Sequence, residues 1–265
     1  MRPHFLRSRL AFVCLLFSCL LTACSEQVGM RRTYVLTTGT TGGTFYPVGV
    51  ALSTLVSAQE EAGFSLTAIS SAGSMENIKL LRDNQAQFGL ILAIFAAWAY
   101  DGEGPIRNPQ RNIRSISAMW PNVEHFVLRS DLVTNGTVSD LANLQGERYS
   151  IGMRNSGAEQ TGIYIFDALG IDYNEDLSIA YMGYGPSANA LQDGNIVGMN
   201  VPAGPPVTAI TRAYALLGDR MTILNFSEEE INAVNAQFPL WDLYQMNPGT
   251  YPLQEKPITT AYSPN

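Results

Sequence analysis

The stretch Thr37-Thr38-Gly39-Thr40-Thr41-Gly42-Gly43-Thr44-Phe45-Tyr46-Pro47 decides the fold of this chain, because it joins a strand pattern to a helix pattern. Before it, Tyr34-Val35-Leu36 is a short run of aromatic and branched residues, which is typical of a buried strand. After it, Pro47 fits the first turn of a helix, and apolar residues recur on one face at positions 48, 51, 52, 55 and 56. The sequence therefore predicts a strand, a loop and a helix, in that order.

This glycine- and threonine-rich loop is a candidate ligand site. A loop that ends at a helix N-terminus presents unpaired backbone N–H groups and the positive end of the helix dipole, and glycines let a ligand approach the backbone. The alternative is a tight turn whose glycines serve packing alone. The loop lacks both the Lys-Ser/Thr of a Walker loop and the Gly-x-Gly-x-x-Gly spacing, so a nucleotide phosphate is disfavoured.

The N-terminus has the pattern of a secretory signal. Three arginines precede the apolar stretch Leu10 to Leu21, and Leu21-Thr22-Ala23-Cys24 supplies a small-residue cleavage site. The apolar stretch is too short to span a membrane comfortably. Because Leu-Thr-Ala-Cys resembles the bacterial lipobox, we expect residues 1–23 to be removed and Cys24 to carry a lipid. An ordinary cleaved signal that happens to hold a cysteine is the alternative.

Composition bounds the class of protein. The 265 residues are 46% hydrophobic and 15% charged, enough to bury a sizeable core in one large domain or two lobes. Loss of the three signal-peptide arginines changes the formal charge from −7 to −10, which argues against a nucleic-acid partner. The chain has only two lysines, Lys79 and Lys256, so membrane association should depend on the Cys24 lipid and not on a polybasic patch.

The cysteines and histidines exclude several kinds of chemistry. Cys14 and Cys19 lie within the signal, so the mature chain would keep Cys24 alone and could form no internal disulfide or thiolate metal site. His125 would be the only histidine left, and its strand-like surroundings favour a structural role over a catalytic one. No Gly-x-Ser-x-Gly elbow is present. We expect no catalytic residue, no metal and no cofactor.

Three later loops repeat the design of the first. The second, residues 70–77, places Ser74 as the N-cap of a helix, although a capped helix with no ligand is the alternative. The third, residues 153–161, opens a helix that ends before Gly170. The fourth is Pro202-Ala203-Gly204-Pro205-Pro206. We expect each loop to follow the carboxyl end of a strand, the edge at which open α/β sheets bind ligands.

The alternation of strands and helices predicts largely parallel sheets. Two sheet edges that face each other would form a cleft, and the region of Trp120-Pro121-Asn122 is predicted to cross from one lobe to the other. No flexible linker of the Gly/Ser or Pro-rich kind separates the halves, so the crossing strands should act as the hinge. Further on, Ser227-Glu228-Glu229-Glu230 predicts a capping box at the start of a helix.

Several segments together, over about Tyr34 to Tyr262, resemble the TAXI receptors, the TRAP-associated extracytoplasmic immunogenic solute-binding proteins. In chain order they are Gly39-Thr40-Thr41-Gly42-Gly43-Thr44-Phe45-Tyr46-Pro47, Gly73-Ser74-Met75-Glu76-Asn77, Ser156-Gly157-Ala158-Glu159, Asp193-Gly194, Ala203-Gly204-Pro205 and Gly249-Thr250-Tyr251-Pro252.

The resemblance implies an α/β, two-lobed periplasmic-binding-protein fold of a type II-like kind, with the ligand cleft between the lobes. We expect a signal peptide over residues 1–23, a tether over 24–32, lobe I over 33–121, lobe II over 122–225 and a return segment towards lobe I over 226–265. The sequence stops at Asn265, before the C-terminal part that lobe I has in this family, so we expect either that this part of lobe I is shortened or that the sequence is a fragment.

The resemblance also implies a function. These receptors bind a small carboxylate, such as glutamate or 2-oxoglutarate, and deliver it to a TRAP-type ion-coupled permease. We therefore expect a non-enzymatic, monomeric receptor in the periplasm, anchored through Cys24, with the outer membrane favoured by Ser25. The alternatives are a lipid-anchored protein that presents its ligand to a membrane sensor and, less favoured, a small serine hydrolase.

We expect twelve residues to bind the ligand. They are Thr40, Thr41, Gly43, Thr44, Tyr46, Ser74 and Asn77 from lobe I, with Arg154, Ser156, Gly157, Gln160 and Gly204 from lobe II. Arg154 is the only cationic residue in the four loops and could hold a carboxylate through two parallel hydrogen bonds. The alternative for Arg154 is a surface arginine paired with Glu159 or another acid.

Overall fold

The computed structural model describes residues 31–236 and 238–265, so the predicted signal peptide, Cys24 and the start of the tether lie outside the described residues. Thr33–Asn265 form one compact unit. None of the helices described is both long and apolar enough to cross a membrane.

The strands are β1 Arg32–Thr37, β2 Phe64–Ile69, β3 Phe88–Gly89, β4 Pro121–Val123, β5 Phe126–Arg129, β6 Glu147–Gly152, β7 Leu177–Tyr181, β8 Gly198–Asn200, β9 Met221–Ile223, β10 Asp242–Met246 and β11 Ile258–Pro264. The helices are α2 Phe45–Ala58, α3 Ser74–Arg82, α4 Ala93–Asp101, α5 Gly157–Leu169, α6 Tyr184–Gln192, α7 Thr208–Leu217 and α8 Glu228–Asn235.

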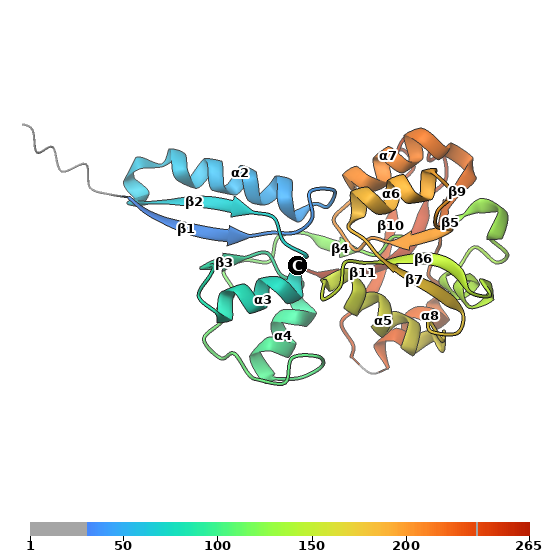
Figure 1. The fold of residues 1–265 in the computed structure, drawn as a ribbon, viewed down its shortest axis with the longest axis horizontal. Coiled ribbons are helices and arrows are strands. Elements are labelled where there is room, and N and C mark those ends of the chain that lie inside the picture. Colours follow the sequence, from blue (N-terminus) through green and yellow to red (C-terminus); the bar gives the residue numbers. More distant parts are fainter. Residues whose placement is uncertain (1–30, 237) are drawn as a thin grey trace, which may run out of the picture. The chain divides into compact units, whose positions relative to one another are not determined.

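The first sheet has the strand order β2-β1-β3, and we call it, with α2, α3 and α4, the first lobe. Strand β1 runs parallel to β3, with Leu36 opposite Phe88. Helix α2 packs along β2 (Figure 1). Strand, loop and helix therefore follow one another as the opening stretch predicts, and the glycine- and threonine-rich loop leaves the carboxyl end of β1.

The second sheet has the order β7-β6-β8-β5-β9, and we call it, with α5, α6 and α7, the second lobe. Helices α6 and α7 cover one face of this sheet, and α5 and α8 cover the other (Figure 1). Strand β6 is parallel to β7 and β8, but β5 is antiparallel to β8 and β9. The prediction of largely parallel sheets is wrong for β5 and for the antiparallel pairs of β10, β11 and β4. Strand β5 follows β4 directly, so no crossover helix returns the chain to the starting edge.

The third sheet joins the chain's C-terminal segment to the crossing strand. Its order is β10-β11-β4, all antiparallel, with Tyr262 of β11 opposite Val123 of β4. The backbone N–H of Met119 also donates to the carbonyl of Asn265, at 3.3 Å. The segment predicted to return towards lobe I therefore pairs with the crossing strand. The lobe boundaries at residues 121 and 225 stay predictions.

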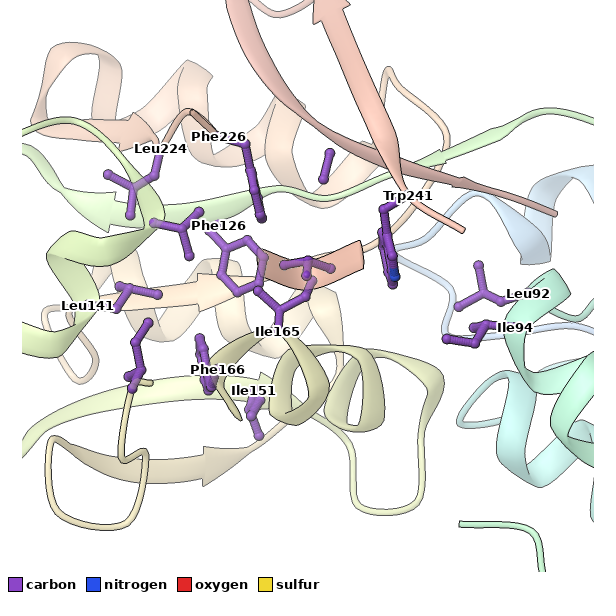
Figure 2. Packing of buried hydrophobic residues seen from close by; sticks show 14 of the residues in the cluster. Leu92, Ile94, Phe126, Leu141, Ile151, Ile165, Phe166, Leu224, Phe226 and Trp241 are labelled. Atoms are coloured by element: carbon purple, nitrogen blue, oxygen red, sulfur yellow. The ribbon is translucent and has the colours of Figure 1, made fainter. Parts of the chain in front are cut away.

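A continuous hydrophobic cluster ties these layers together. It includes Phe126, Ile165 and Phe166 of the second lobe and Leu92 and Ile94 of the first, all buried (Figure 2). Burial of apolar surface is the main stabilising term in folding, and here the same cluster contributes to both lobes. The α/β fold class is confirmed, and the described part of the chain holds the two lobes against each other through a shared core.

Two helix starts show where local sequence rules succeed and fail. The Ser227 hydroxyl accepts the Glu230 N–H and the Glu230 carboxylate accepts the Ser227 N–H, which confirms the capping box. Ser74 was expected as an N-cap, but Gly73 occupies that position and Ser74 is the first helical residue. The Ser74 hydroxyl oxygen instead accepts a hydrogen bond from the backbone N–H of Leu92, which is distant in the sequence, at 3.0 Å.

We expect Gly198→Ala to destabilise the second lobe. A Cβ at Gly198 would overlap the carbonyl oxygen of Val127 and the ring of Tyr149, so the sheet or the ring must shift. Overpacking of this kind costs about 1–3 kcal/mol. Chemical denaturation should show this loss for Gly198→Ala and little change for the control Gly185→Ala, whose Cβ would meet nothing within 4 Å. Equal stability of both variants would contradict the packing described for β8.

Candidate functional site

A cavity of about 30 Å³ lies where the loops of the two lobes meet, large enough for about two water molecules. Helices α2, α3, α5 and α6 begin at its wall. The lining residues are Gly39, Thr40, Gly43, Thr44, Phe45, Ala72, Gly73, Ser74, Leu92, Asn122, Gly157, Ala158, Tyr184, Pro202 and Ala203. Their side chains are mostly small or apolar, so backbone groups supply much of the polar surface.

The first loop closes one side of the cavity and bridges the lobes. The Thr44 hydroxyl donates to the carbonyl of Gly204 at 2.7 Å, and the Ala209 N–H donates to the carbonyl of Gly42 at 3.2 Å. Thr40 also lines the cavity, and its hydroxyl oxygen is buried without a hydrogen-bond partner among the described residues. An unpartnered hydroxyl at a cavity wall is available to a ligand.

The second and third loops meet across the cavity through glycine. Gly73 has φ +114°, a conformation that other residues rarely adopt, and lies opposite the backbone of Gly157. A Cβ on Gly157 would lie 3.2 Å from the Ser74 hydroxyl oxygen and 3.3 Å from a Leu92 methyl. Side chains at these positions would therefore fill or distort the narrow space between α3 and α5.

Asn77 does not line the cavity but fixes the loops that do. Its Oδ1 accepts the Thr37 hydroxyl at 2.6 Å, and its Nδ2 donates to the carbonyls of Thr38 and Leu90 at 2.6 and 2.7 Å. The side chain is fully buried. Because these bonds use its hydrogen-bonding groups, Asn77 is a positioning residue that holds the ends of β1 and β3 together.

The predicted contacts of the third loop divide into two groups. Gly157 lines the cavity, and the buried Ser156 caps α5 by accepting the Glu159 N–H at 3.1 Å. Arg154 is exposed and does not line the cavity; its guanidinium lies over the Tyr181 ring, 3.7 Å from the centroid. Arg154 therefore makes a cation–π contact, and neither the cavity contact nor the Glu159 pair is formed.

The remaining predicted residues lie beside the cavity. Thr41 is exposed and Tyr46 is half-buried, and neither lines it. Gln160 donates to the Glu159 carboxylate at 3.2 Å, and Gly204 contributes its carbonyl to Thr44. Of the twelve predicted residues, the structure brings Thr40, Gly43, Thr44, Ser74 and Gly157 to the cavity wall.

Asn122 and Tyr184 line the cavity but were not predicted to bind. Asn122 is 1% exposed, and no described residue accepts a hydrogen bond from its Nδ2. The Tyr184 hydroxyl donates to the carbonyl of Pro202 at 3.0 Å. The only sequence signal for Asn122 is its place in the predicted crossing between lobes, since a lone asparagine after a proline has no motif.

Glu124 is a buried acid close behind this wall. It is completely buried, and neither carboxyl oxygen has a hydrogen-bond partner in the described parts of the chain. Burial raises the pKa of Glu124 to about 8, because a charged carboxylate is poorly solvated there. The side chain is therefore mainly protonated at pH 7.

His125 has a structural role, as predicted. Its Nδ1 lies 2.9 Å from the carbonyls of both Val123 and Val201, and its Nε2 lies 2.7 Å from the Tyr251 hydroxyl. Since carbonyls only accept, Nδ1 carries the proton and Nε2 accepts from Tyr251. Burial lowers the pKa of His125 to about 4, so the ring is neutral at pH 7. Within residues 31–236 and 238–265, no three His, Cys, Asp or Glu side chains gather into a potential metal site.

The fold and site define an α/β protein with a small cavity between two sheet-bearing lobes. The family model described as NMT1-like matches residues 36–265, and the chain belongs to this family. The match does not single out the TAXI receptors, which stay a prediction.

Several solved structures are similar at low identity. They include the alkanesulfonate-binding protein SsuA from Xanthomonas axonopodis pv. citri bound to MOPS (14% identity, 74% of this chain, 61% of that chain, TM-score 0.47). Another is the amino acid ABC transporter substrate-binding protein AbpA from Streptococcus pneumoniae bound to L-arginine (12% identity, 90% of this chain, 83% of that chain, TM-score 0.46). A third is a binding-protein component of an ABC phosphonate transporter from Pseudomonas aeruginosa (11% identity, 87% of this chain, 82% of that chain, TM-score 0.45). The chain spans about 60% of the length of SsuA from Xanthomonas and from Escherichia coli. Similarity at this level does not determine a ligand.

We expect Glu124→Gln to change how stability depends on pH. The folded-state pKa of Glu124 is raised to about 8, so between about pH 4.5 and pH 8 the folded chain keeps a proton that the unfolded chain has lost. Because of Glu124, the free energy of unfolding of the wild type therefore falls by up to about 1.4 kcal/mol for each pH unit in this range. The glutamine variant cannot titrate at this position and lacks this loss. Urea denaturation at several pH values should show a gain in stability of the variant over wild type that grows towards pH 8. A difference independent of pH would contradict a buried, titrating Glu124.

Proposed function

We propose that the protein is an extracytoplasmic solute receptor that binds a small carboxylate in the cavity between its lobes. The proposal rests mainly on the observation that four helices begin at one cavity wall. At this wall the side-chain nitrogen of the buried Asn122 and the hydroxyl of Thr40 have no hydrogen-bond partner among the described residues. Helix N-termini favour anions, because their first N–H groups are unpaired and the dipole is positive there. The unpartnered groups add hydrogen bonds that would orient the anion.

The size of the cavity favours movement on ligand entry. About 30 Å³ is small for an amino or keto acid, so we expect the loops to move apart as the ligand enters. Two hydrogen bonds join the lobes there, from Thr44 to Gly204 and from Ala209 to Gly42. Hinge opening about the crossing strands would break them, and closure on a ligand would restore them.

The ligand contacts in this proposal are Thr40, Gly43, Thr44, Ser74, Asn122 and Gly157. Of the other residues predicted to bind, Ser156 and Asn77 position loops, and Arg154 lies on Tyr181 outside the cavity. A carboxylate would therefore be held by backbone N–H groups and neutral side chains, and not by an arginine clamp.

The serine hydrolase alternative has less support. A nucleophilic serine needs a base within hydrogen-bond reach. His125, the one histidine in the part of the chain that the structure describes, has both ring nitrogens engaged with Val123, Val201 and Tyr251. The Ser74 and Ser156 hydroxyls each accept a backbone N–H. A receptor needs no such base.

The proposed partners follow from the TAXI resemblance. A TRAP-type permease would take the solute from the receptor, and the Cys24 lipid would hold the receptor at a bacterial membrane, with the outer membrane favoured. Delivery to a membrane sensor would use the same cavity, and the genes next to this one would distinguish the two partners.

The binding proposal is tested by ligand identification and by a pair of threonine variants. Native mass spectrometry of the purified protein should find a co-purified carboxylate. Calorimetry with that compound, or with glutamate and 2-oxoglutarate, should show an affinity about tenfold weaker for Thr40→Val, since a hydrogen bond to a charged group contributes about 1.5–3 kcal/mol. Thr41→Val is the matched control, because Thr41 is exposed next to the cavity and does not line it. Equal losses in both variants, or a cationic co-purified ligand, would contradict the proposed site.

The anchor proposal is tested at Cys24. Cys24→Ser removes the thiol that would be acylated, so the protein should move from the membrane fraction to the soluble periplasmic fraction. Cell fractionation and mass spectrometry of the N-terminus would follow this change. Unchanged membrane retention of the variant would refute anchoring through Cys24.

A further inference from the structure

We propose that Glu124 lies directly behind the wall of the ligand site, next to the wall residue Asn122, and that only its neutral form favours an anionic solute, so that affinity falls when Glu124 ionises. This inference rests on the proposed function and adds a residue and a pH response to it. Neither the opening loop nor any later motif predicts this residue as part of the site.

The register of the strands places Glu124 behind the cavity wall. Asn122 lines the cavity, and the backbone hydrogen bonds of Val123 with Ala203 and of His125 with Val201 keep the chain extended between β4 and β5, so Glu124 projects to the same side as Asn122. Phe126 continues this side, and it pairs with Asn200 in the antiparallel β5–β8 register. Paired residues project to the same face of a sheet, which puts Asn200 on the Glu124 side as well.

Contacts connect this face to the cavity. Asn200 Nδ2 donates to the carbonyl of Ala158 at 3.0 Å, and Ala158 lines the cavity. The ring of Tyr149 lies against Gly198, two residues before Asn200 on the same face of β8. Tyr184 lines the cavity and is close enough to Glu124 for a carboxylate there to raise the pKa of its phenol. The face under α5 and the cavity wall are therefore contiguous.

Polar atoms without partners are concentrated in this region. They comprise Asn122 Nδ2, both carboxyl oxygens of Glu124, the Tyr149 hydroxyl and Asn200 Oδ1, all buried and unpartnered in the described residues. Buried polar groups are almost always hydrogen-bonded, to protein or to a guest molecule. Of these residues Asn122 lines the cavity, and the others lie behind it, so a polar guest in the cavity would lie next to this group of unpartnered atoms.

The charges around Glu124 favour its neutral form. No salt bridge involves Glu124 among the described residues. The neutral His125 points to the opposite side, towards Tyr251, and the Glu159 carboxylate on α5 accepts the Asn155 N–H at 2.6 Å. Burial raises the pKa of Tyr149 and Tyr184, so both phenols stay neutral. A neutral carboxyl can donate to an anion, whereas a carboxylate in this low-dielectric region would repel it.

The test is calorimetry with 2-oxoglutarate between pH 7 and pH 9.5, a range in which this probe has no titrating amine. Wild-type affinity should fall by about tenfold or more across the range, because Glu124 titrates near pH 8. Glu124→Gln keeps the shape and a hydrogen-bond donor but cannot ionise, so its affinity, whatever its value at pH 7, should not fall between pH 7 and pH 9.5. Glu230→Gln is the control, since the Glu230 carboxylate is bound by Ser139 and Ser227 at the start of α8, and it should keep the wild-type pH dependence.

A second measurement needs no variant. Calorimetry in two buffers of different ionisation enthalpy should show that 2-oxoglutarate binding takes up a fraction of a proton, most clearly between pH 8 and pH 9. Proton release on binding, or pH-dependent affinity that persists in Glu124→Gln, would overturn the role of Glu124 and leave the receptor proposal intact. Failure of 2-oxoglutarate to bind any of the three proteins at any pH would count against the carboxylate-receptor proposal itself and would overturn this inference with it.

Discussion

The crossing segment of residues 121–129 is the constraint on which the rest of the structure depends, because it belongs to two sheets at once. Strand β4 pairs with β11, and β5, only two residues later, pairs with β8 and β9. His125 lies at the change of sheet, where Nδ1 is shared by the carbonyls of Val123 and Val201 and Nε2 accepts from Tyr251. A neutral imidazole is suited to this position, since it donates on one side and accepts on the other without adding charge. The strand is thereby fixed in direction, and so are the side chains on its other face, Asn122 and Glu124.

The cavity follows from a second constraint, the close approach of the two lobes through glycine. A Cβ at Gly42 would lie 2.9 Å from the backbone nitrogen of Gly185, and one at Gly157 would crowd Ser74. These loops can therefore meet backbone to backbone, which is the arrangement in which helix N-termini act on a small anion. The interpretation of the opening loop as a ligand site and its interpretation as a packing turn are compatible here. The glycines allow the packing, and the packing brings the backbone N–H groups of several helices to one place.

The sequence predicted elements whose cause is local and missed those whose cause is distant. The loop from β1 to α2, the capping box at Ser227 and the structural role of His125 depend on near neighbours or on strand pattern, and all three were predicted. The hydroxyl of Ser74 was misassigned because its partner, Leu92, is eighteen residues away. Asn77 has the hydrogen-bonding groups expected of a ligand contact, yet they bind Thr37, Thr38 and Leu90. Asn122 and Glu124 carried no motif, since only the tertiary structure places Asn122 at the cavity wall and buries Glu124 behind it.

Glu124 and His125 are adjacent titratable residues on the crossing strand, and burial shifts their pKa values in opposite directions so that both stay neutral. His125 stays neutral because burial lowers its pKa to about 4, and Glu124 stays neutral because burial raises its pKa to about 8. Below about pH 6.5 the unfolded chain gains a proton on the histidine that the folded chain does not take up until about pH 4, so this group lowers stability as the pH falls. Above about pH 4.5 the unfolded chain loses the Glu124 proton that the folded chain keeps up to about pH 8, so Glu124 lowers stability as the pH rises. Above about pH 6.5 the histidine no longer contributes, and of the two groups only Glu124 changes stability with pH. Burial therefore leaves both Glu124 and His125 uncharged at neutral pH, although an acid and a base lie side by side on the crossing strand. In the proposed opening of the lobes, this strand would change its packing most easily without a charge at these two buried positions, because moving a buried charge would alter its solvation energy.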